Sequence, residues 1–203
     1  MQPRSHNISR TTGDSMSYWE PRTEFSKYAP LQLVDETQHR QIILPLLYDT
    51  PARRKDDWVT PSVRFQSNAP SLPALSHQSN FPGLYALPAW DAKAIELLNP
   101  LVENSVEYLP LDCDEGEFWL VNVLDVADCL DSEQSEFFTL EADGKQGVRH
   151  YVHKPGCLEG HHIFRTPEHQ YKRIFVSDEF KALVENSDLV GLKFVPAPWE
   201  RKS

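Results

Sequence analysis

Three aspartates near the middle of the chain have the spacing that acid–base or metal chemistry needs. Asp125, Asp128 and Asp131 lie in the segment VLDVADCLD. A single helical turn would place Asp128 and Asp131 on one face, where two carboxylates could act as acid and base or bind a cation. No basic group or nucleophile accompanies them, and such residues often cap backbone groups where a strand ends. We therefore favour a structural role for Asp128 and Asp131.

A second group combines imidazoles with a thiol: His150, His153, Cys157, His161 and His162. These are zinc ligands, and their spacing would allow them to converge across a loop. However, His150 and His153 would point to opposite faces of a strand, and only one thiolate is available. We interpret the group as a polar loop and predict no metal and no other cofactor.

Motifs of common enzymes do not occur in the sequence. It has no glycine-rich phosphate loop, no G-x-S-x-G elbow and no H-E-x-x-H pair. The three cysteines, Cys113, Cys129 and Cys157, form neither a C-x-x-C pair nor an even set, so we expect no disulfide framework. Acidic neighbours should raise the thiol pKa of Cys113 and Cys129, which argues against nucleophiles. We predict that the protein is not an enzyme.

Two further features bear on the compartment. The N-terminal residues MQPRSHNISRTTGDSMS lack the apolar core of a secretory signal. No window approaches the roughly 18 apolar residues of a membrane span. Together with the cysteine set, this predicts a cytoplasmic protein without membrane contact.

Acidic residues are concentrated in one quarter of the chain. Between Ala94 and Gly144 there are 14 Asp and Glu and no Lys, Arg or His, and the whole chain has a net charge of −10. The other 152 residues carry 16 acidic and 20 basic side chains. Such a block repels nucleic acid and attracts a basic partner, mainly through the rate and orientation of association. The alternative is a solvated acidic face that only aids solubility.

The first part of the chain predicts little regular structure. Residues 1–17 are polar and aperiodic, so we expect a disordered tail. Residues 18–80 form a proline-rich, variable part of the domain, in which seven prolines favour loops and short strands over long helices. Apolar runs at Leu31–Val34, Ile42–Tyr48 and Val63–Phe65 are the candidate short elements.

Residues 81–200 form the core in this interpretation. A helix is predicted from Pro88 through Leu98, ended or kinked by Asn99-Pro100. Strands are predicted at Val106–Leu111 and Phe118–Val126, with the acidic turn Asp112–Glu117 between them. Apolar side chains on both parities of the second strand predict burial on both faces.

The remaining elements are two hairpins, a helix and a last strand. The hairpins pair Phe137–Leu140 with Val148–Val152, and His161–Arg165 with Arg173–Val176. Ser177 caps the helix, and Leu192–Val195 is the strand. A chain of 203 residues with this pattern predicts a single α+β domain: a mixed, mainly antiparallel sheet with two or three short helices.

Six short motifs follow one another between Pro73 and Pro196, over about three fifths of the chain: PALSHQ, VEYLPL, FWLVNVLDVADCLDSEQS, HHIFR, IFVSDEFKALVE and LVGLKFVP. This series resembles the motifs of bacterial immunity protein family eleven. The family, formerly a domain of unknown function, occurs beside polymorphic secreted toxins. The motif residues imply structural roles rather than catalysis: Asp128, Leu130, Asp131, Ser135, Phe164, Phe180, Gly191 and Phe194.

The resemblance implies an antitoxin that neutralises a cognate toxin by binding it. With the acidic block, this predicts contacts to a basic toxin surface from Asp112, Asp114, Glu115, Glu117, Glu133 and Glu136. The alternatives are a hydrolase that uses the Asp125–Asp131 carboxylates or a metal held by the histidine group, and a regulatory interaction protein on the same fold.

Overall fold

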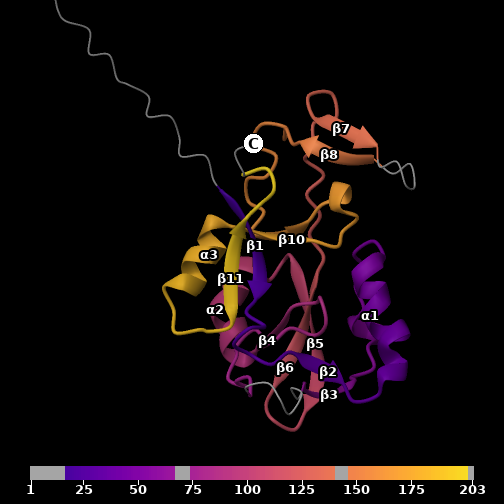
Figure 1. Cartoon of the computed structure of the whole chain (residues 1–203), viewed down its shortest axis with the longest axis vertical. Helices are drawn as coiled ribbons and strands as arrows, with labels where there is room; N and C mark the ends of the chain where they lie inside the picture. The colour runs from indigo at the N-terminus through magenta and orange to yellow at the C-terminus, as the bar shows by residue number, and fades with distance from the viewer. Residues whose placement is uncertain (1–16, 67–73, 140–145, 201–203) are drawn as a thin grey trace, which may run out of the picture.

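The computed structural model describes residues 17–66, 74–139 and 146–200; residues 1–16 of the predicted tail lie outside these ranges. The described residues form eleven strands and three α-helices, arranged as two main sheets and a separate hairpin (Figure 1). In both main sheets, strands from residues 18–80 pair with strands from residues 81–200. The predicted α+β class with mainly antiparallel pairing is confirmed.

The five-stranded sheet has the order β2–β3–β5–β6–β4. Only β3 and β5 are parallel among its pairs. The predicted strands before and after the acidic turn are confirmed as β5 and β6. The bounds are β2 Leu31–Leu33, β3 Ser62–Phe65, β4 Ala89–Asp91, β5 Val106–Cys113 and β6 Phe118–Val123.

The four-stranded sheet has the order β11–β1–β10–β9 and is antiparallel throughout. β9 and β10 confirm one predicted hairpin, and β7 with β8 confirms the other. Residues 140–145, which connect the two strands of this second hairpin, lie outside the described residues. The bounds are β1 Tyr18–Thr23, β7 Glu136–Thr139, β8 Gln146–His150, β9 Ile163–Arg165, β10 Ile174–Ser177 and β11 Leu192–Pro196.

The first helix, α1 (His39–Tyr48), corrects the prediction of loops and short strands for the proline-rich part. Pro45 lies inside it, where a proline removes one backbone hydrogen bond. Ile43 and Leu46 are buried, and packing of this face offsets the loss. The carbonyl of Leu46 also accepts a 2.9 Å hydrogen bond from Arg165 Nη1.

The second helix, α2 (Ala92–Val102), begins four residues after the predicted start at Pro88. The intervening residues form β4, because pairing with the central strand β6 outweighs the local helix signal. Asp91 caps the helix by accepting a 2.8 Å hydrogen bond from Ala94 N. Pro100 does not end the helix, which continues to the buried Val102.

The third helix, α3 (Asp178–Glu185), begins as predicted at Ser177, whose Oγ accepts a 3.3 Å hydrogen bond from Phe180 N. Gly191, between α3 and β11, has φ of +105°. This left-handed turn favours glycine, and a Cβ there would overlap Ser79 Oγ. None of the described helices combines the length and apolar character needed to cross a membrane.

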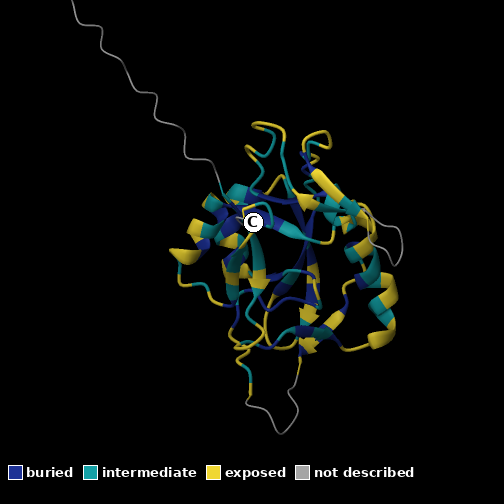
Figure 2. Ribbon diagram, turned by 45° about the horizontal axis from the view of Figure 1, so that its top comes forward, coloured by how far each residue is buried: buried dark blue, intermediate teal, exposed yellow. Residues whose placement is uncertain are grey.

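The apolar core is organised on β6, which is buried on both faces as predicted. Phe118 and Leu120 point to one core, formed with α1, β2 and β3. Val121 and Val123 point to a second core, formed with α2 and α3. Figure 1 shows α1 on one side of the molecule and α2 and α3 on the other, and Figure 2 shows buried residues concentrated between them.

An aromatic cluster near the C-terminus contains a buried histidine. The His153 ring lies 4.8 Å from Trp199 between centroids, and the His169 ring 6.2 Å from it. His169 contacts the Thr166 hydroxyl through Nδ1 at 2.8 Å and the Tyr151 hydroxyl through Nε2 at 3.1 Å. Burial is the main cause that lowers the pKa of His169 to about 4. The imidazole is therefore neutral at pH 7.

Acid should destabilise the fold through His169. The pKa of this group is 6.5 in the unfolded chain and about 4 in the folded one. The unfolded state therefore takes up the proton first, and stability is lost as the pH falls from about 6.5 toward 4. The His169 contribution is about 2 kcal/mol between pH 7 and pH 5. His169→Gln should remove this part of the pH dependence in urea unfolding, whereas His150→Gln, at an exposed site, should not. Equal pH dependence in all three proteins would contradict this assignment.

Candidate functional site

The acidic turn, Asp112–Glu117, projects from the end of the β5–β6 ladder. The two strands pair continuously from Val106 opposite Val123 to Leu111 opposite Phe118, which holds the turn on a regular hairpin. All four carboxylates that were predicted on this turn are exposed: Asp112, Asp114, Glu115 and Glu117. The turn therefore presents four negative charges to solvent.

Two of the four carboxylates are engaged by other parts of the chain. Asp112 accepts a 2.8 Å hydrogen bond from a β3 hydroxyl, and Glu115 Oε2 lies 2.7 Å from His77 Nδ1. Within the described residues, Asp114 and Glu117 have no hydrogen-bond or ion-pair partner. These two side chains are the freest to meet a partner.

Cys113, in the same turn, is the one free cysteine in the described part of the chain. Burial raises the pKa of its thiol, and the carboxylates of Glu115, Asp114 and Asp112 raise it further. The predicted direction is confirmed for Cys113. A thiol in this environment is a poor nucleophile at neutral pH.

The other two predicted partner-binding residues, Glu133 and Glu136, are exposed but lie elsewhere. Glu136 begins β7, and Glu133 precedes it. In Figure 1 the β7–β8 hairpin is at the upper end of the molecule, and β5 and β6 lead to the acidic turn at the lower end. The structure thus divides the six predicted residues into two separate groups.

The three aspartates belong to the crossover segment, residues 124–135, between β6 and β7. Residues 124–131 contain no helical turn and bridge to β9 and to the loop after β8, and a turn follows at residues 132–134. The helical turn considered for Asp128 and Asp131 is therefore wrong. Asp131 Oδ1 accepts hydrogen bonds of 3.0 and 3.1 Å from the backbone amides of Glu133 and Gln134, which confirms a capping role. Asp125 Oδ2 lies 2.8 Å from His161 Nδ1, and Asp128 is exposed. The three carboxylates do not form one site.

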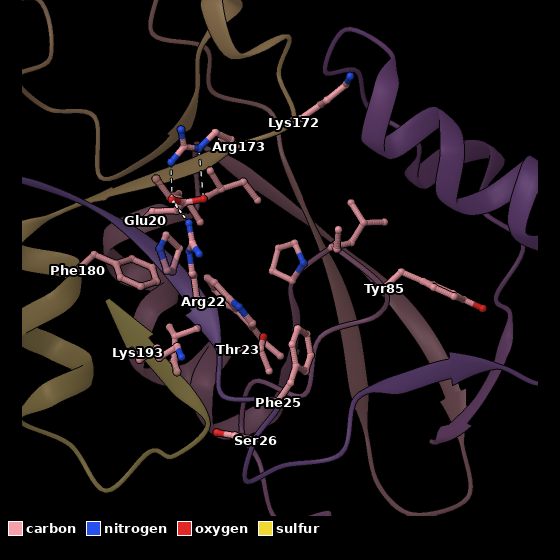
Figure 3. Close-up of a pocket in the computed structure, with 18 residues that line it drawn as sticks. Glu20, Arg22, Thr23, Phe25, Ser26, Tyr85, Lys172, Arg173, Phe180 and Lys193 are labelled. Atoms are coloured by element: carbon pink, nitrogen blue, oxygen red, sulfur yellow. Dashed lines mark hydrogen bonds and ion pairs between the residues drawn. The ribbon is translucent and has the colours of Figure 1, made fainter. Parts of the chain in front are cut away.

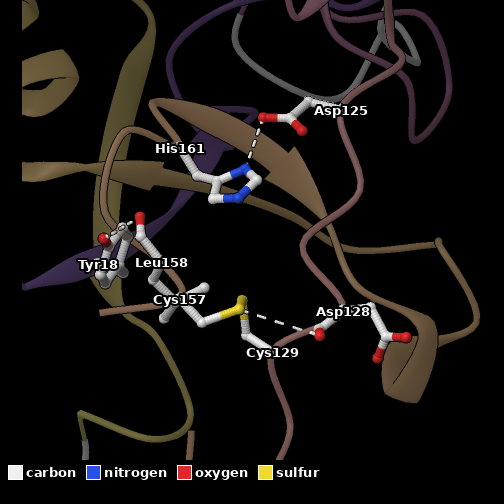
Figure 4. The surroundings of a disulfide bond; sticks show 7 residues. All are labelled: Tyr18, Asp125, Asp128, Cys129, Cys157, Leu158 and His161. Carbon is white, nitrogen blue, oxygen red and sulfur yellow. Dashed lines mark hydrogen bonds and ion pairs between the residues drawn. A yellow bond between two sulfur atoms is a disulfide. The ribbon is translucent and has the colours of Figure 1, made fainter. Parts of the chain in front are cut away.

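The cysteine of the histidine and cysteine group, Cys157, forms a disulfide with Cys129 (Figure 4). The Cα–Cα distance is 5.6 Å. The expectation of no disulfide is wrong, because folding brings the crossover segment beside the loop of Cys157. Cys157 is thereby removed as a thiolate ligand. No group of three or more His, Cys, Asp and Glu in the described residues is arranged to hold a metal ion. Because Cys129 and Cys157 are paired, the cysteines do not indicate a reducing compartment. The cytoplasmic location stays a prediction.

A serine, a histidine and a glutamate meet at the start of α3. His162 Nδ1 lies 3.1 Å from Ser177 Oγ and 3.3 Å from Glu179 Oε2. A catalytic relay needs the hydroxyl and the carboxylate on opposite ring nitrogens, whereas here both contact Nδ1. Ser177 is also fully buried and caps α3. The arrangement fits a helix cap and not a nucleophilic triad.

A cleft of about 510 Å³, absent from the sequence predictions, lies beside the four-stranded sheet (Figure 3). At its edge Arg173 donates hydrogen bonds of 3.3 and 2.6 Å to Glu20, and Arg22 donates one of 2.9 Å. The lining residues run from Glu20 to Lys193 in the sequence. No local motif could have revealed a site assembled over that separation.

The described residues thus define an α+β protein that presents an acidic turn and a cleft, without an assembled metal or nucleophile site among them. Residues 104–198 match the family described as Immunity protein family (Imm11). This confirms the resemblance over these residues, whereas PALSHQ and the following helix lie outside the match. The matched family consists of immunity proteins. A search of curated proteins found none that matches.

The disulfide should contribute measurably to stability. It joins residues 28 apart in sequence, and a cross-link of that loop length is worth about 3–4 kcal/mol. Cys129→Ser/Cys157→Ser should lose about this amount in urea unfolding without reductant. Reductant should destabilise the natural chain equally and leave the double variant unchanged, and Cys113→Ser should behave like the natural chain. Equal stability of the natural and double-variant proteins without reductant would contradict the pairing.

Proposed function

We propose that this protein binds and neutralises a cognate secreted toxin in the cytoplasm of the bacterium that produces both. The match of residues 104–198 to immunity proteins supports this role. We further propose that the acidic turn is the main contact and that the toxin surface it meets is basic. The toxin would then be inhibited by occupation of that surface and not by chemistry on this chain.

The observation that carries the proposal is the exposure of four carboxylates within six residues. Like charges held this close create a local negative potential, which accelerates the encounter with a basic surface. Exposed charges also cost less to bring into an interface when the opposite charges there replace their water contacts. Asp114 and Glu117, which lack partners in the described residues, would form such contacts without breaking existing ones.

The hairpin that carries the turn favours high affinity as well. A turn held by a long antiparallel ladder has little conformational freedom to lose on association. The buried Phe118 and Leu111 anchor its two ends. The binding free energy is therefore not reduced by the entropy cost of ordering a loop.

Charge reversal on the turn tests the proposal. Asp114→Lys/Glu117→Lys should lower the association rate constant with the neighbouring-gene toxin domain about tenfold or more at low salt. The difference should shrink toward 0.5 M NaCl, where exposed charges are screened within a few ångströms. Stopped-flow or biolayer measurements across a salt series, together with protection of cells that express the toxin, give the readouts.

Two matched variants complete this experiment. Glu103→Lys/Glu159→Lys makes the same charge change at exposed residues away from the turn and should alter the rate less than twofold. Glu133→Lys/Glu136→Lys examines the group at the other end of the molecule. If the turn variant binds the toxin with unchanged rate and salt dependence, the turn is not the contact. Stoichiometric zinc or manganese in the purified protein would favour the hydrolase alternative instead.

A further inference from the structure

The cleft beside the four-stranded sheet has a charge opposite to that of the whole protein. Its lining contains four cationic side chains and one carboxylate, an excess of three positive charges on a chain of net charge −10. The cationic residues are Arg22, Lys172, Arg173 and Lys193. Arg22 comes from β1, Lys193 from β11, and Lys172 and Arg173 from the two residues before β10, so the cluster joins segments that are distant in sequence. The fold therefore collects cations from a chain in which acids predominate.

The single carboxylate does not neutralise this cluster. Burial alone would raise the pKa of Glu20, but hydrogen bonds from Arg173 and Arg22 outweigh it and lower the pKa below its usual value. Glu20 thus stays ionised and holds the two guanidinium groups in place (Figure 3). Lys193 is exposed and has no carboxylate partner within the described residues. The Lys172 ammonium donates a hydrogen bond to Gln170 and lies over the Tyr48 ring, and it too has no carboxylate partner within the described residues.

The rest of the cleft is largely apolar. Leu87, Trp90, Ile163 and Phe180 line it and are buried. Phe25 also lines it and is 48% exposed, which is high for an aromatic residue. A volume of about 510 Å³ is within the range of natural small-molecule sites.

A purely structural ion-pair cluster accounts for only part of this arrangement. Arg22, Arg173 and Glu20 suffice to join β1 to β10, as their hydrogen bonds show. Lys193 adds an exposed cation without a carboxylate partner in the described residues, and an entering anion would be attracted to it. The Lys172 side chain extends toward α1, where its ammonium lies over the Tyr48 ring (Figure 3), and it adds positive charge at the rim of the cleft. Apolar surface and unneutralised cations together match a molecule that has both an apolar body and an anionic group.

We propose that the cleft binds a small organic anion, with its aromatic or aliphatic body against Phe25, Leu87 and Trp90 and its anionic group toward Lys193 and the arginines. This site is separate from the acidic turn and does not depend on a toxin being bound. The bound class is a carboxylate, sulfonate or phosphate carried by an apolar body of one or two rings.

Two dyes with the same aromatic skeleton test the proposal in the full-length protein. The anionic probe is 8-anilinonaphthalene-1-sulfonate, and the uncharged probe is N-phenyl-1-naphthylamine. Fluorescence titration should give one site that prefers the anionic dye. Lys172→Glu/Lys193→Glu, which leaves the Glu20 hydrogen bonds intact, should raise the Kd of the anionic dye about tenfold or more. The uncharged dye should change less than twofold.

Two further variants make the outcome decisive. Lys55→Glu/Lys154→Glu makes the same charge change at exposed residues outside the cleft and should leave both dyes unaffected. Ala86→Trp fills the opening and should weaken both dyes, with circular dichroism confirming that each variant is folded. Equal loss of the anionic dye in the two charge-reversal variants would overturn the proposal, as would undiminished binding to a folded Ala86→Trp protein. Toxin is absent from the assay, so its result is independent of the proposed immunity function.

Discussion

The burial of both faces of β6 is the constraint on which the rest of the structure depends. Its alternate side chains supply two separate cores, so neither α1 nor the α2–α3 pair can pack unless this strand is in register. A buried polar pair defines that register: Asn122 lies opposite Glu107 and donates a 2.7 Å hydrogen bond to it. Arg54 N donates to the same Glu107 oxygen, also at 2.7 Å. A slip of one residue would move both polar groups against apolar side chains and leave them unpaired.

Arg165 connects α1, which lies outside the family match, to the matched part of the chain. Its backbone joins β9 to the crossover segment, and its side chain donates to the Leu46 carbonyl near the end of α1. Burial lowers the pKa of Arg165 to about 10, so the guanidinium remains charged at neutral pH. A cation near a helix C-terminus interacts favourably with the carbonyl dipoles there. One buried residue thus links α1 through its side chain, and β9 and the segment that carries the disulfide through its backbone.

Elements determined by local pattern were predictable, and those determined by distant contacts were not. The apolar alternation of β5 and β6 and the Ser177 cap are contained in a few adjacent residues. The start of α2 was predicted four residues too early, because β4 forms only through pairing with β6. The Cys129–Cys157 bond and the cleft likewise require segments that fold together from far apart in sequence. The exposure of the acidic turn could be predicted from its charge. Its separation from Glu133 could not, because that separation depends on the path of the crossover segment.

The acidic turn and the cationic cleft are built from different parts of the chain, so substitutions can change one without changing the other. The acidic turn lies wholly within residues 104–198, the part that matches the immunity family. The cleft combines Arg173 and Lys193 from that part with Glu20 and Arg22 from β1, outside the match. Substitutions in β1 would therefore alter the charge of the cleft without touching the turn. Because exposed charges more than about 10 Å apart are largely screened at physiological salt, the two surfaces can acquire separate ligands on one fold.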